Sequence, residues 1–120
     1  MTVEEIARDL VRLVRAGRDD EAGRKYWAPT VRSIEGAAEM AVAEGPEATA
    51  AKGEWFMDNH EVHDVRVEGP WMNGNQFAAR FTYDLTPKAT GQRVAFDEIA
   101  VYTVEGEKIA EERFFYAPAR

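Results

Sequence analysis

The chain of 120 residues contains no cysteine, which excludes disulfides, thiolate nucleophiles and cysteine-ligated zinc or iron–sulfur sites. It has one serine, Ser33, and no Gly-x-Ser-x-Gly turn, so a serine nucleophile is not expected. No run of about 18 apolar residues occurs, so no segment is predicted to span a membrane. The N-terminus lacks the basic segment and apolar stretch of a secretory signal, and we therefore expect a cytoplasmic protein.

Basic residues are also few: 15 Lys and Arg stand against 22 Asp and Glu, for a formal net charge of -7. Such a chain would repel a phosphate backbone, so we expect no nucleic-acid partner. P-loop and dinucleotide-binding fingerprints are absent, and we expect no cofactor. The hydrophobic fraction of 45% is ordinary for a globular protein, and the length allows one domain over residues 1–120.

The first half of the chain has helical periodicity. A capping-box pattern begins at Thr2 and precedes an amphipathic run that should stop at Gly17. Asp19 or Asp20 can cap a second helix, which should end at Tyr26 because a proline follows three residues later. These two segments predict a helical hairpin.

A third helix is expected from Pro46 to near Asn59, since proline suits the first position of a helix. We expect one face of this helix to carry four apolar residues: Ala48, Ala51, Trp55 and Phe56. Between the second and third helices, residues 31–35 predict a short strand. Residues 36–45 are interpreted as a loop or a broken helix.

From residue 62 onward the hydrophobic period changes to two. A first strand should break at Gly69-Pro70, and residues 73–75 form a turn. The next strand places five apolar residues on one face: Phe77, Ala79, Phe81, Tyr83 and Leu85. Residues 93–104 and 108–116 then predict a hairpin. This order indicates an α+β fold with three N-terminal helices on one face of a mostly antiparallel sheet.

Two segments carry a family resemblance: residues 102–109 (Tyr-Thr-Val-Glu-Gly-Glu-Lys-Ile) and residues 68–77 (Glu-Gly-Pro-Trp-Met-Asn-Gly-Asn-Gln-Phe). With the order of elements, they resemble the nuclear transport factor 2-like superfamily, and in particular its SnoaL-like domains of unassigned function. The superfamily includes ketosteroid isomerase, limonene epoxide hydrolase and the SnoaL-like polyketide cyclases. Here a glutamate interrupts the family's usual Gly-Lys-Ile.

The resemblance implies a cone-shaped α+β barrel, in which a curved sheet and the helices leave a pocket at the mouth. It also implies a homodimer through the outer face of the sheet. Arg80, Thr82 and Asp84 would lie on that face. The motifs are structural, so they indicate the fold and not the reaction.

Periodicity alone leaves open which way the last hairpin faces. A three-residue loop at 105–107 would pair Ala100 with Glu112, whereas one further loop residue would bring Glu111 onto the Glu98 face. The resemblance to limonene epoxide hydrolase-like sequences favours the first arrangement. It places six residues inside the cone: Glu98, Ala100, Tyr102, Glu112, Phe114 and Tyr116.

Glu98 and Glu112 are therefore candidate catalytic residues. Burial and a second nearby carboxylate both raise the pKa of a carboxyl group, which can then donate or accept a proton near neutral pH. The resemblance to ketosteroid isomerase adds Glu35, at the end of the short first strand. Its pattern is incomplete, because Ala100 stands where the isomerase has a protonated acid. The epoxide hydrolase pattern is incomplete too, because Phe114 replaces its last acid.

The alternative is that Glu98 or Glu112 forms a structural ion pair with Arg80, Arg93 or Arg113 and only ties the sheet together. His60 and His63 have a spacing that could bind a metal on a helix, but they lie at a helix-to-strand junction, so no metal site is expected.

Aromatic residues are expected to fill the core, and those near the mouth to bind a flat apolar ligand. The candidates are Trp27, Trp55, Phe81, Tyr83, Tyr102, Phe114 and Tyr116. The sequence thus favours cofactor-free acid–base chemistry (isomerisation, cyclisation or hydration) by Glu98, Glu112 and Glu35 on a small apolar or aromatic molecule. The alternative is a non-catalytic ligand-binding or dimerisation module of the same fold.

Overall fold

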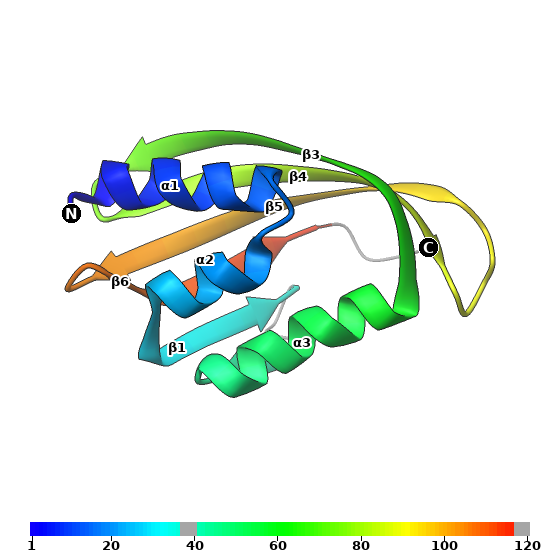
Figure 1. Cartoon of the computed structure of the whole chain (residues 1–120), viewed down its shortest axis with the longest axis horizontal. Helices are drawn as coiled ribbons and strands as arrows, with labels where there is room; N and C mark the ends of the chain where they lie inside the picture. Colours follow the sequence, from blue (N-terminus) through cyan, green and yellow to red (C-terminus); the bar gives the residue numbers. More distant parts are fainter. Residues whose placement is uncertain (37–40, 117–120) are drawn as a thin grey trace.

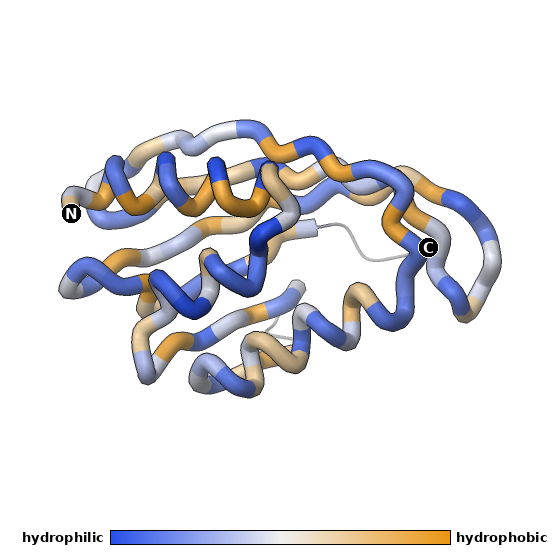
Figure 2. The backbone as a smooth tube through the Cα atoms, in the orientation of Figure 1, coloured by the Kyte–Doolittle hydropathy of each residue, from blue (hydrophilic) through white to orange (hydrophobic). Residues whose placement is uncertain are grey.

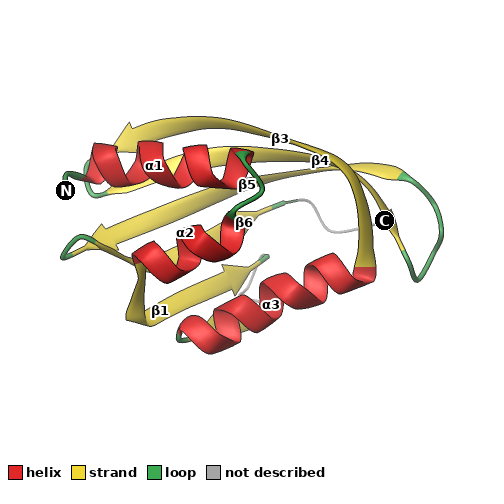
Figure 3. Cartoon of the chain, viewed as in Figure 1, coloured by secondary structure: helices red, strands yellow, loops and turns green. Residues whose placement is uncertain are grey.

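The computed structural model describes residues 1–36 and 41–116. Three helices, α1 (Val3–Arg15), α2 (Asp19–Tyr26) and α3 (Pro46–Asn59), pack against one side of a curved, open sheet (Figure 1). The strands are β1 (Trp27–Glu35), β2 (Ala41–Glu44), β3 (His60–Asn73), β4 (Gln76–Pro87), β5 (Val94–Glu105) and β6 (Lys108–Phe115). They form one sheet in the order β2-β1-β6-β5-β4-β3, in which only β1 and β6 are parallel neighbours. The predicted α+β class is confirmed (Figure 3).

The core lies between α1 and the concave side of the sheet. The predicted capping box is present, because Thr2 Oγ1 accepts from the Glu5 amide at 3.1 Å and Glu5 Oε1 accepts from the Thr2 amide at 2.8 Å. The apolar stripe of α1 faces the sheet (Figure 2). Four of the five residues predicted for the inner face of β4 are buried: Phe77, Ala79, Phe81 and Leu85. The first three belong to the same core cluster as the apolar residues of α1.

The second helix begins at Asp19, so neither Asp19 nor Asp20 precedes it as a cap. Asp19 is already helical, and Arg18 before it makes no side-chain cap, so the capping prediction was wrong. The helix ends at Tyr26 as predicted, and β1 follows at once. Gly23 is needed here, because a Cβ atom at this position would lie 2.5 Å from the Trp27 ring. The missing side chain lets that ring pack against α2.

Residues 41–44 correct the expectation of a loop or broken helix. They form β2, an antiparallel edge strand in which Glu44 pairs with Arg32 and Ala41 with Glu35. Backbone pairing with β1 outweighs the helix propensity of the alanines. Residues 37–40 of the same expectation lie outside the described residues.

Helix α3 has the predicted bounds, but its predicted inner face was wrong. Ala48, Ala51 and Trp55 are exposed, with Trp55 at 61%. The helix instead turns Thr49, which is buried, and the half-buried Lys52 and Phe56 toward the sheet. On this face Lys52 bonds to β1 and the Thr49 hydroxyl donates to the Gly45 carbonyl, so the hydropathy of the helix does not identify its inner face.

Strand β3 continues through Gly69-Pro70, where a break was expected. Glu68 pairs with Arg80 and Trp71 with Ala78, so β3 has one extra residue at this point and forms a β-bulge. Gly69 has a φ of 116°, and a Cβ atom there would lie 2.9 Å from the Ala78 carbonyl oxygen. Glycine thus allows the strand to bend without ending.

The last hairpin differs from the prediction in its register, but its side chains point to the predicted sides of the sheet. Its turn has two residues, Gly106 and Glu107, both with positive φ (55° and 65°), as in a type I′ turn. A register shift after Val104 leaves one extra residue on β6, and Tyr102 pairs with Glu112. The predicted pairing of Ala100 with Glu112 was therefore wrong. Because the two changes displace the register by an even number, Glu98 and Glu112 still share the inner face.

Residues predicted for the outer face of the sheet do lie there. Arg80 and Thr82 both bond Asp97, at 3.2 and 2.7 Å. None of the helices among the described residues is long and apolar enough to cross a membrane.

Candidate functional site

Strands β1, β5 and β6 bring the three candidate glutamates to one region of the inner face, beneath α3. Glu35 ends β1, Glu98 lies on β5 and Glu112 lies on β6. The parallel pairing of β1 with β6 places Ser33 directly beside Glu112. The charge of Glu35 raises the pKa of both other carboxyls, so the three groups interact electrostatically.

Glu112 is held by two hydrogen bonds. The indole Nε1 of Trp27 donates to Oε1 at 2.8 Å, and the Ser33 hydroxyl donates to Oε2 at 2.7 Å. The residue is only 7% exposed, and its burial raises the pKa of the carboxyl, while the two bonds oppose that rise. Each oxygen thus has a donor, and the carboxyl is fixed in one orientation.

Lys52 of α3 links Glu35 to the Ser33 hydroxyl, which in turn bonds Glu112. Its ammonium donates to the Ser33 hydroxyl and to Glu35 Oε2, the latter at 2.7 Å, and it lies 4.9 Å from the centre of the Phe114 ring. The Tyr116 hydroxyl donates to the other oxygen of Glu35 at 3.2 Å. These contacts form a continuous network from Tyr116 through Glu35, Lys52 and Ser33 to Glu112 and Trp27.

Sequence reasoning missed Lys52 and noted Ser33 only as an unsuitable nucleophile. One signal was available: Lys52 is the sole basic residue of α3, three residues after Thr49 and four before Phe56. That spacing places all three on one side of the helix. A lone cation on this side would have indicated an acidic partner on the sheet.

Glu98 differs from its neighbours in having no partner. It is half-buried and makes no hydrogen bond or ion pair with the part of the chain that the structure describes. Burial raises the pKa of Glu98 to about 8; Glu35 and Glu112 add to the rise, and Lys52 opposes it. At neutral pH the carboxyl is therefore mostly protonated, with both forms present near pH 8.

The predicted alternative, a structural pair with an arginine, is not found for Glu98 or Glu112 within residues 1–36 and 41–116. Arg80 pairs with Asp97 at 3.2 Å, and Arg93 pairs with Asp84 at 2.6 Å. Arg113 pairs with Glu111 at 3.6 Å. The partners of Glu112 are the uncharged side chains of the half-buried Trp27 and the buried Ser33.

Aromatic residues lie on the strand faces next to Glu98, which pairs with Phe81 across β4 and β5. The half-buried Tyr83 on β4 pairs with Phe96 on β5, with ring centres 6.2 Å apart, and Phe96 meets Tyr116 edge-on at 5.4 Å. Tyr102 is buried and stacks on Phe77 at 4.8 Å. Burial raises the pKa of both Tyr83 and Tyr102, and the charge of Glu98 raises both further.

The hydroxyls of Tyr83 and Tyr102 have no hydrogen-bond partner among the described residues. Yet no fully buried side-chain nitrogen or oxygen of those residues is left without a partner. The two hydroxyl oxygens, like the carboxyl of Glu98, must therefore border space that solvent can enter.

The remaining predicted ligand-binding residues have different surroundings. Trp27 bonds Glu112, Phe81 packs in the core, and the half-buried Phe114 lies under the Lys52 ammonium. Trp55 lies outside this cluster, on the exposed side of α3, with its ring edge-on to His60 at 6.1 Å.

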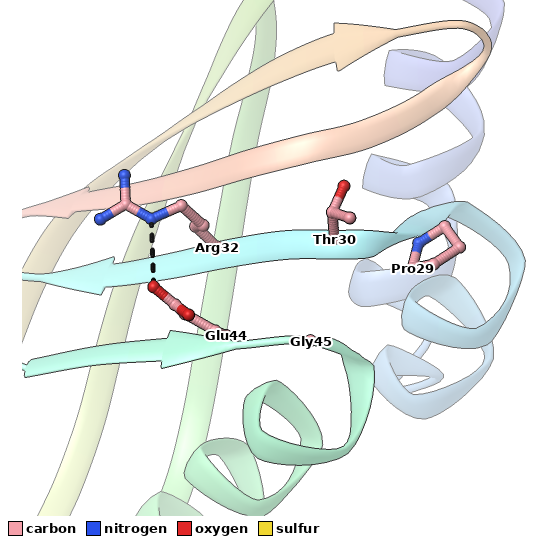
Figure 4. A pocket seen from close by; sticks show the side chains of 5 residues that line it. All are labelled: Pro29, Thr30, Arg32, Glu44 and Gly45. Atoms are coloured by element: carbon pink, nitrogen blue, oxygen red, sulfur yellow. Dashed lines mark ion pairs between the residues drawn. The ribbon is translucent and has the colours of Figure 1, made fainter.

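Two surface pockets lie away from the glutamates. One lies between β1 and β2, where Arg32 faces Glu44 at 3.8 Å; its lining residues are Pro29, Thr30, Arg32, Glu44 and Gly45 (Figure 4). The other lies between the N-terminus, α1 and the end of α2. Neither pocket contains Glu35, Glu98 or Glu112, so neither is the pocket expected at the cone's mouth.

The two histidines have separate partners. His60 Nδ1 bonds the Phe56 carbonyl at 2.7 Å, and His63 Nε2 bonds the Thr86 hydroxyl at 2.8 Å. Over residues 1–36 and 41–116, no group of three or more histidine, aspartate or glutamate side chains could hold a metal ion.

Comparisons with known proteins agree with this architecture. The sequence model of the SnoaL-like domain matches residues 1–116. A crystal structure from Mesorhizobium loti, of a protein provisionally named a SnoaL-like polyketide cyclase and carbohydrate phosphatase, is 52% identical; the match covers 97% of this chain and 100% of that one, with a TM-score of 0.91.

More distant structures share the fold. A protein from Jannaschia, provisionally named a SnoaL-like polyketide cyclase, is 19% identical over 92% of this chain and 86% of its own, with a TM-score of 0.71. A nuclear transport factor 2-like protein from Burkholderia thailandensis is 16% identical over 98% of this chain and 92% of its own, with a TM-score of 0.84. The comparison with curated proteins found no match.

Proposed function

Because the chain belongs to the SnoaL-like domain family, we propose that it is a cofactor-free acid–base enzyme acting on a small apolar or aromatic molecule. One observation carries the proposal: Glu98 is the only one of the three clustered carboxyls without a partner among the described residues, and its pKa lies at about 8. A group that titrates near the working pH is best suited to give and take a proton within one turnover.

Glu98 is the residue that exchanges the proton. In its neutral form the carboxyl donates to a carbonyl oxygen or an unsaturated carbon of the ligand, and in its ionised form it takes a proton back. Isomerisation, cyclisation and hydration all require such a pair of steps. The provisional name of the Mesorhizobium loti relative, a polyketide cyclase, is consistent with cyclisation.

Glu112 and Glu35 support this group through their positions and charges. Glu112 accepts two hydrogen bonds and stays fixed, while Glu35 is paired with Lys52. Their negative charges favour the neutral form of Glu98, and Lys52 limits the effect. The rings of Tyr83, Phe96 and Tyr116 supply the apolar surface that holds the ligand.

The test is exchange of carbon-bound hydrogen for deuterium in a panel of aromatic and alicyclic ketones, followed by proton NMR. The panel is first screened for binding by thermal shift. We expect the protein to accelerate exchange, and Glu98→Gln to slow it by about 100-fold or more. Glu112→Gln should slow it less, by disturbing the network. Asp97→Asn is the matched control, since this neighbouring acid lies on the outer face. Equal exchange in Glu98→Gln and the parent would refute the proposal.

The second candidate is a non-catalytic ligand-binding or dimerisation module of the same fold. The placement of both surface pockets away from the glutamates favours it. Under this alternative, ligands from the panel would bind without any exchange, and Glu98→Gln would leave binding unchanged.

We also propose a cytoplasmic homodimer formed through the outer face of the sheet. Exposed apolar residues on that face support the interface: Trp71, Ile99 and Phe115. Light scattering after size exclusion should give a dimer mass, and Phe115→Arg should give a monomer. A monomeric parent protein would contradict this part of the proposal.

A further inference from the structure

Helix α3 carries an apolar row on a side that the sheet does not cover. Ala48, Ala51 and Trp55 are spaced three and four residues apart, so they lie in one row along the helix, here called the Trp55 row. All three are exposed, and 61% of Trp55 is accessible to solvent. Among the described residues, the only ring that meets the indole is that of His60, edge-on at 6.1 Å. Helix α3 lies at one border of the molecule, so a partner can reach the row (Figure 1).

The packing of α3 on the sheet does not use the Trp55 row, because Thr49, Lys52 and Phe56 form the inner face of the helix. Single apolar residues are common on protein surfaces, but a row that includes a tryptophan has the composition of an interface. The two alanines are small, so side chains of a partner can approach the helix backbone closely beside the indole. The row is therefore available for contact with another chain.

Acidic residues border the Trp55 row. Glu47, Glu54 and Asp58 are exposed, and their spacing of seven and four residues places them in a second row beside the first. None of the three forms an ion pair or hydrogen bond with a described residue. Lys52, the sole basic residue of the helix, is bonded to Glu35 on the inner face. The outer side of α3 thus carries negative charge and no positive charge of its own.

The last of these acids does not stabilise the helix that carries it. The C-terminal end of a helix is favoured by positive charge, yet the last turn of α3 contains Asp58 and no basic residue. Asp58 therefore opposes the helix dipole. A charge that lowers local stability without an evident structural gain is typical of a functional surface.

We propose that the Trp55 row binds a cationic amphipathic helix of another protein, whose lysine or arginine side chains lie against the acidic row. The side of a helix has no free backbone groups, so a strand cannot add to it, whereas the apolar face of a second helix can pack along the row. Charge complementarity sets the sign of the partner, because the bordering residues are all acidic. The formal net charge of -7 also attracts a basic partner and disfavours a second copy of this chain.

The experiment uses the full chain and a synthetic helical peptide with leucine on one face and lysine beside it. The comparison peptide has glutamate in place of every lysine. We expect the lysine peptide to bind at least about tenfold more tightly in isothermal titration, with the largest NMR shift changes in α3. Its affinity should fall between about 0.1 M and about 0.5 M salt, because the charges are exposed. No binding, equal affinity for the two peptides, or shift changes centred on another face would overturn the inference.

Single variants test the Trp55 row. Trp55→Ala should weaken binding of the lysine peptide about tenfold or more, since a tryptophan that becomes buried contributes much of the binding free energy. Met57→Ala is the matched control: Met57 is 57% exposed, but it lies two residues from Trp55 and therefore on another side of the helix. It should change the affinity by less than about twofold. Thermal unfolding checks that both variants keep the fold of the parent. Equal losses of affinity in the two variants would contradict a contact through the Trp55 row.

Two triple variants test the acidic row. The first replaces the acids of α3 by amides: Glu47→Gln, Glu54→Gln and Asp58→Asn. The second removes the same charge from exposed positions outside α3: Asp20→Asn, Asp64→Asn and Glu105→Gln. We expect the first to weaken the lysine peptide at least about tenfold and the second less than about twofold. If both lose equal affinity, the general field of the protein explains binding and the inference fails.

This inference does not depend on the proposed acid–base function, and the two fail separately. Glu98→Gln should bind the lysine peptide as the parent does, whether or not the protein exchanges ketone hydrogens. Light scattering of Trp55→Ala distinguishes the remaining occupant. A mass below that of the parent would show that the Trp55 row joins two copies of this chain, which would overturn the assignment to another protein.

Discussion

Ser33 on β1 lies directly beside Glu112 on the parallel strand β6, and its hydroxyl donates to the buried carboxyl at 2.7 Å. The same hydroxyl accepts a bond from Lys52. The single serine of the chain therefore connects the carboxyl to the Lys52 ammonium. Several properties of the site depend on this contact.

We predict that Ser33→Ala destabilises the protein by about 1–3 kcal/mol, because Glu112 loses a donor while it stays buried. Urea unfolding at constant pH measures the change in free energy of unfolding. Thr82→Val is the matched control: it removes a hydroxyl that donates to the exposed Asp97, and should cost less than about 1 kcal/mol. An equal decrease in the free energy of unfolding in the two variants would show that the buried Ser33–Glu112 bond stabilises the protein no more than the exposed Thr82–Asp97 bond.

The stability of the protein should fall as pH rises toward 8. The folded state holds the Glu98 proton to about pH 8, whereas the unfolded chain releases it near the ordinary value of 4.5. The folded state thus binds more protons in this range, so the free energy of unfolding decreases with pH. Because solvent reaches part of the half-buried side chain, we expect a loss of about 1–3 kcal/mol.

Glu98→Gln should remove most of this pH dependence and be more stable than the parent above about pH 8. Urea unfolding at several values between about pH 5 and pH 9 measures both curves, and Asp97→Asn should run parallel to the parent. A Glu98→Gln curve that also runs parallel to the parent would show that Glu98 titrates at its ordinary pKa.

Lys52 should limit the proton affinity of Glu98. Lys52→Met removes a positive charge that lowers the pKa of Glu98, and leaves Glu35 without its ion pair. We predict a pKa of Glu98 above that of the parent, measured from its carboxyl carbon in an NMR titration. Lys52→Arg retains the charge and should stay close to the parent. A lower pKa in Lys52→Met would mean that the ammonium does not act on Glu98.

A separate cluster joins α1 to α2. Asp9 bonds Lys25 at 2.7 Å and also Arg12 and Tyr26, and these bonds hold its pKa well below the ordinary value. The stabilisation is therefore present above about pH 4 and is lost as pH falls further. Asp9→Asn should cost about 1–3 kcal/mol at neutral pH in urea unfolding, and Asp20→Asn, on the exposed start of α2, less than about 0.5 kcal/mol. Equal costs would contradict a specific role for Asp9.

The fold was predictable because its main signals are local. The capping box at Thr2 and the alternation on β4 depend on neighbouring residues, and both were confirmed. The facing of the last hairpin was also predicted correctly, although its register was not. A two-residue turn with one extra residue on β6 places the same side chains on the inner face as a three-residue turn without a bulge. Periodicity therefore cannot distinguish the two arrangements.

The site was less predictable because it depends on contacts between distant segments. The inner face of α3 is polar, and only its position over β1 shows that Lys52 points inward while Trp55 is exposed. The contact of Ser33 with Glu112 joins residues 79 positions apart through a parallel pairing, and no local pattern indicates it.

Titration of the Glu98 carboxyl carbon by NMR, assigned by its absence in Glu98→Gln, tests the central claim most directly. The account predicts a midpoint at about 8, well above that of the exposed glutamates in the same spectrum. A midpoint near the ordinary value of 4.5 would contradict it, because Glu98 would then be ionised throughout the neutral range and would have no proton to give.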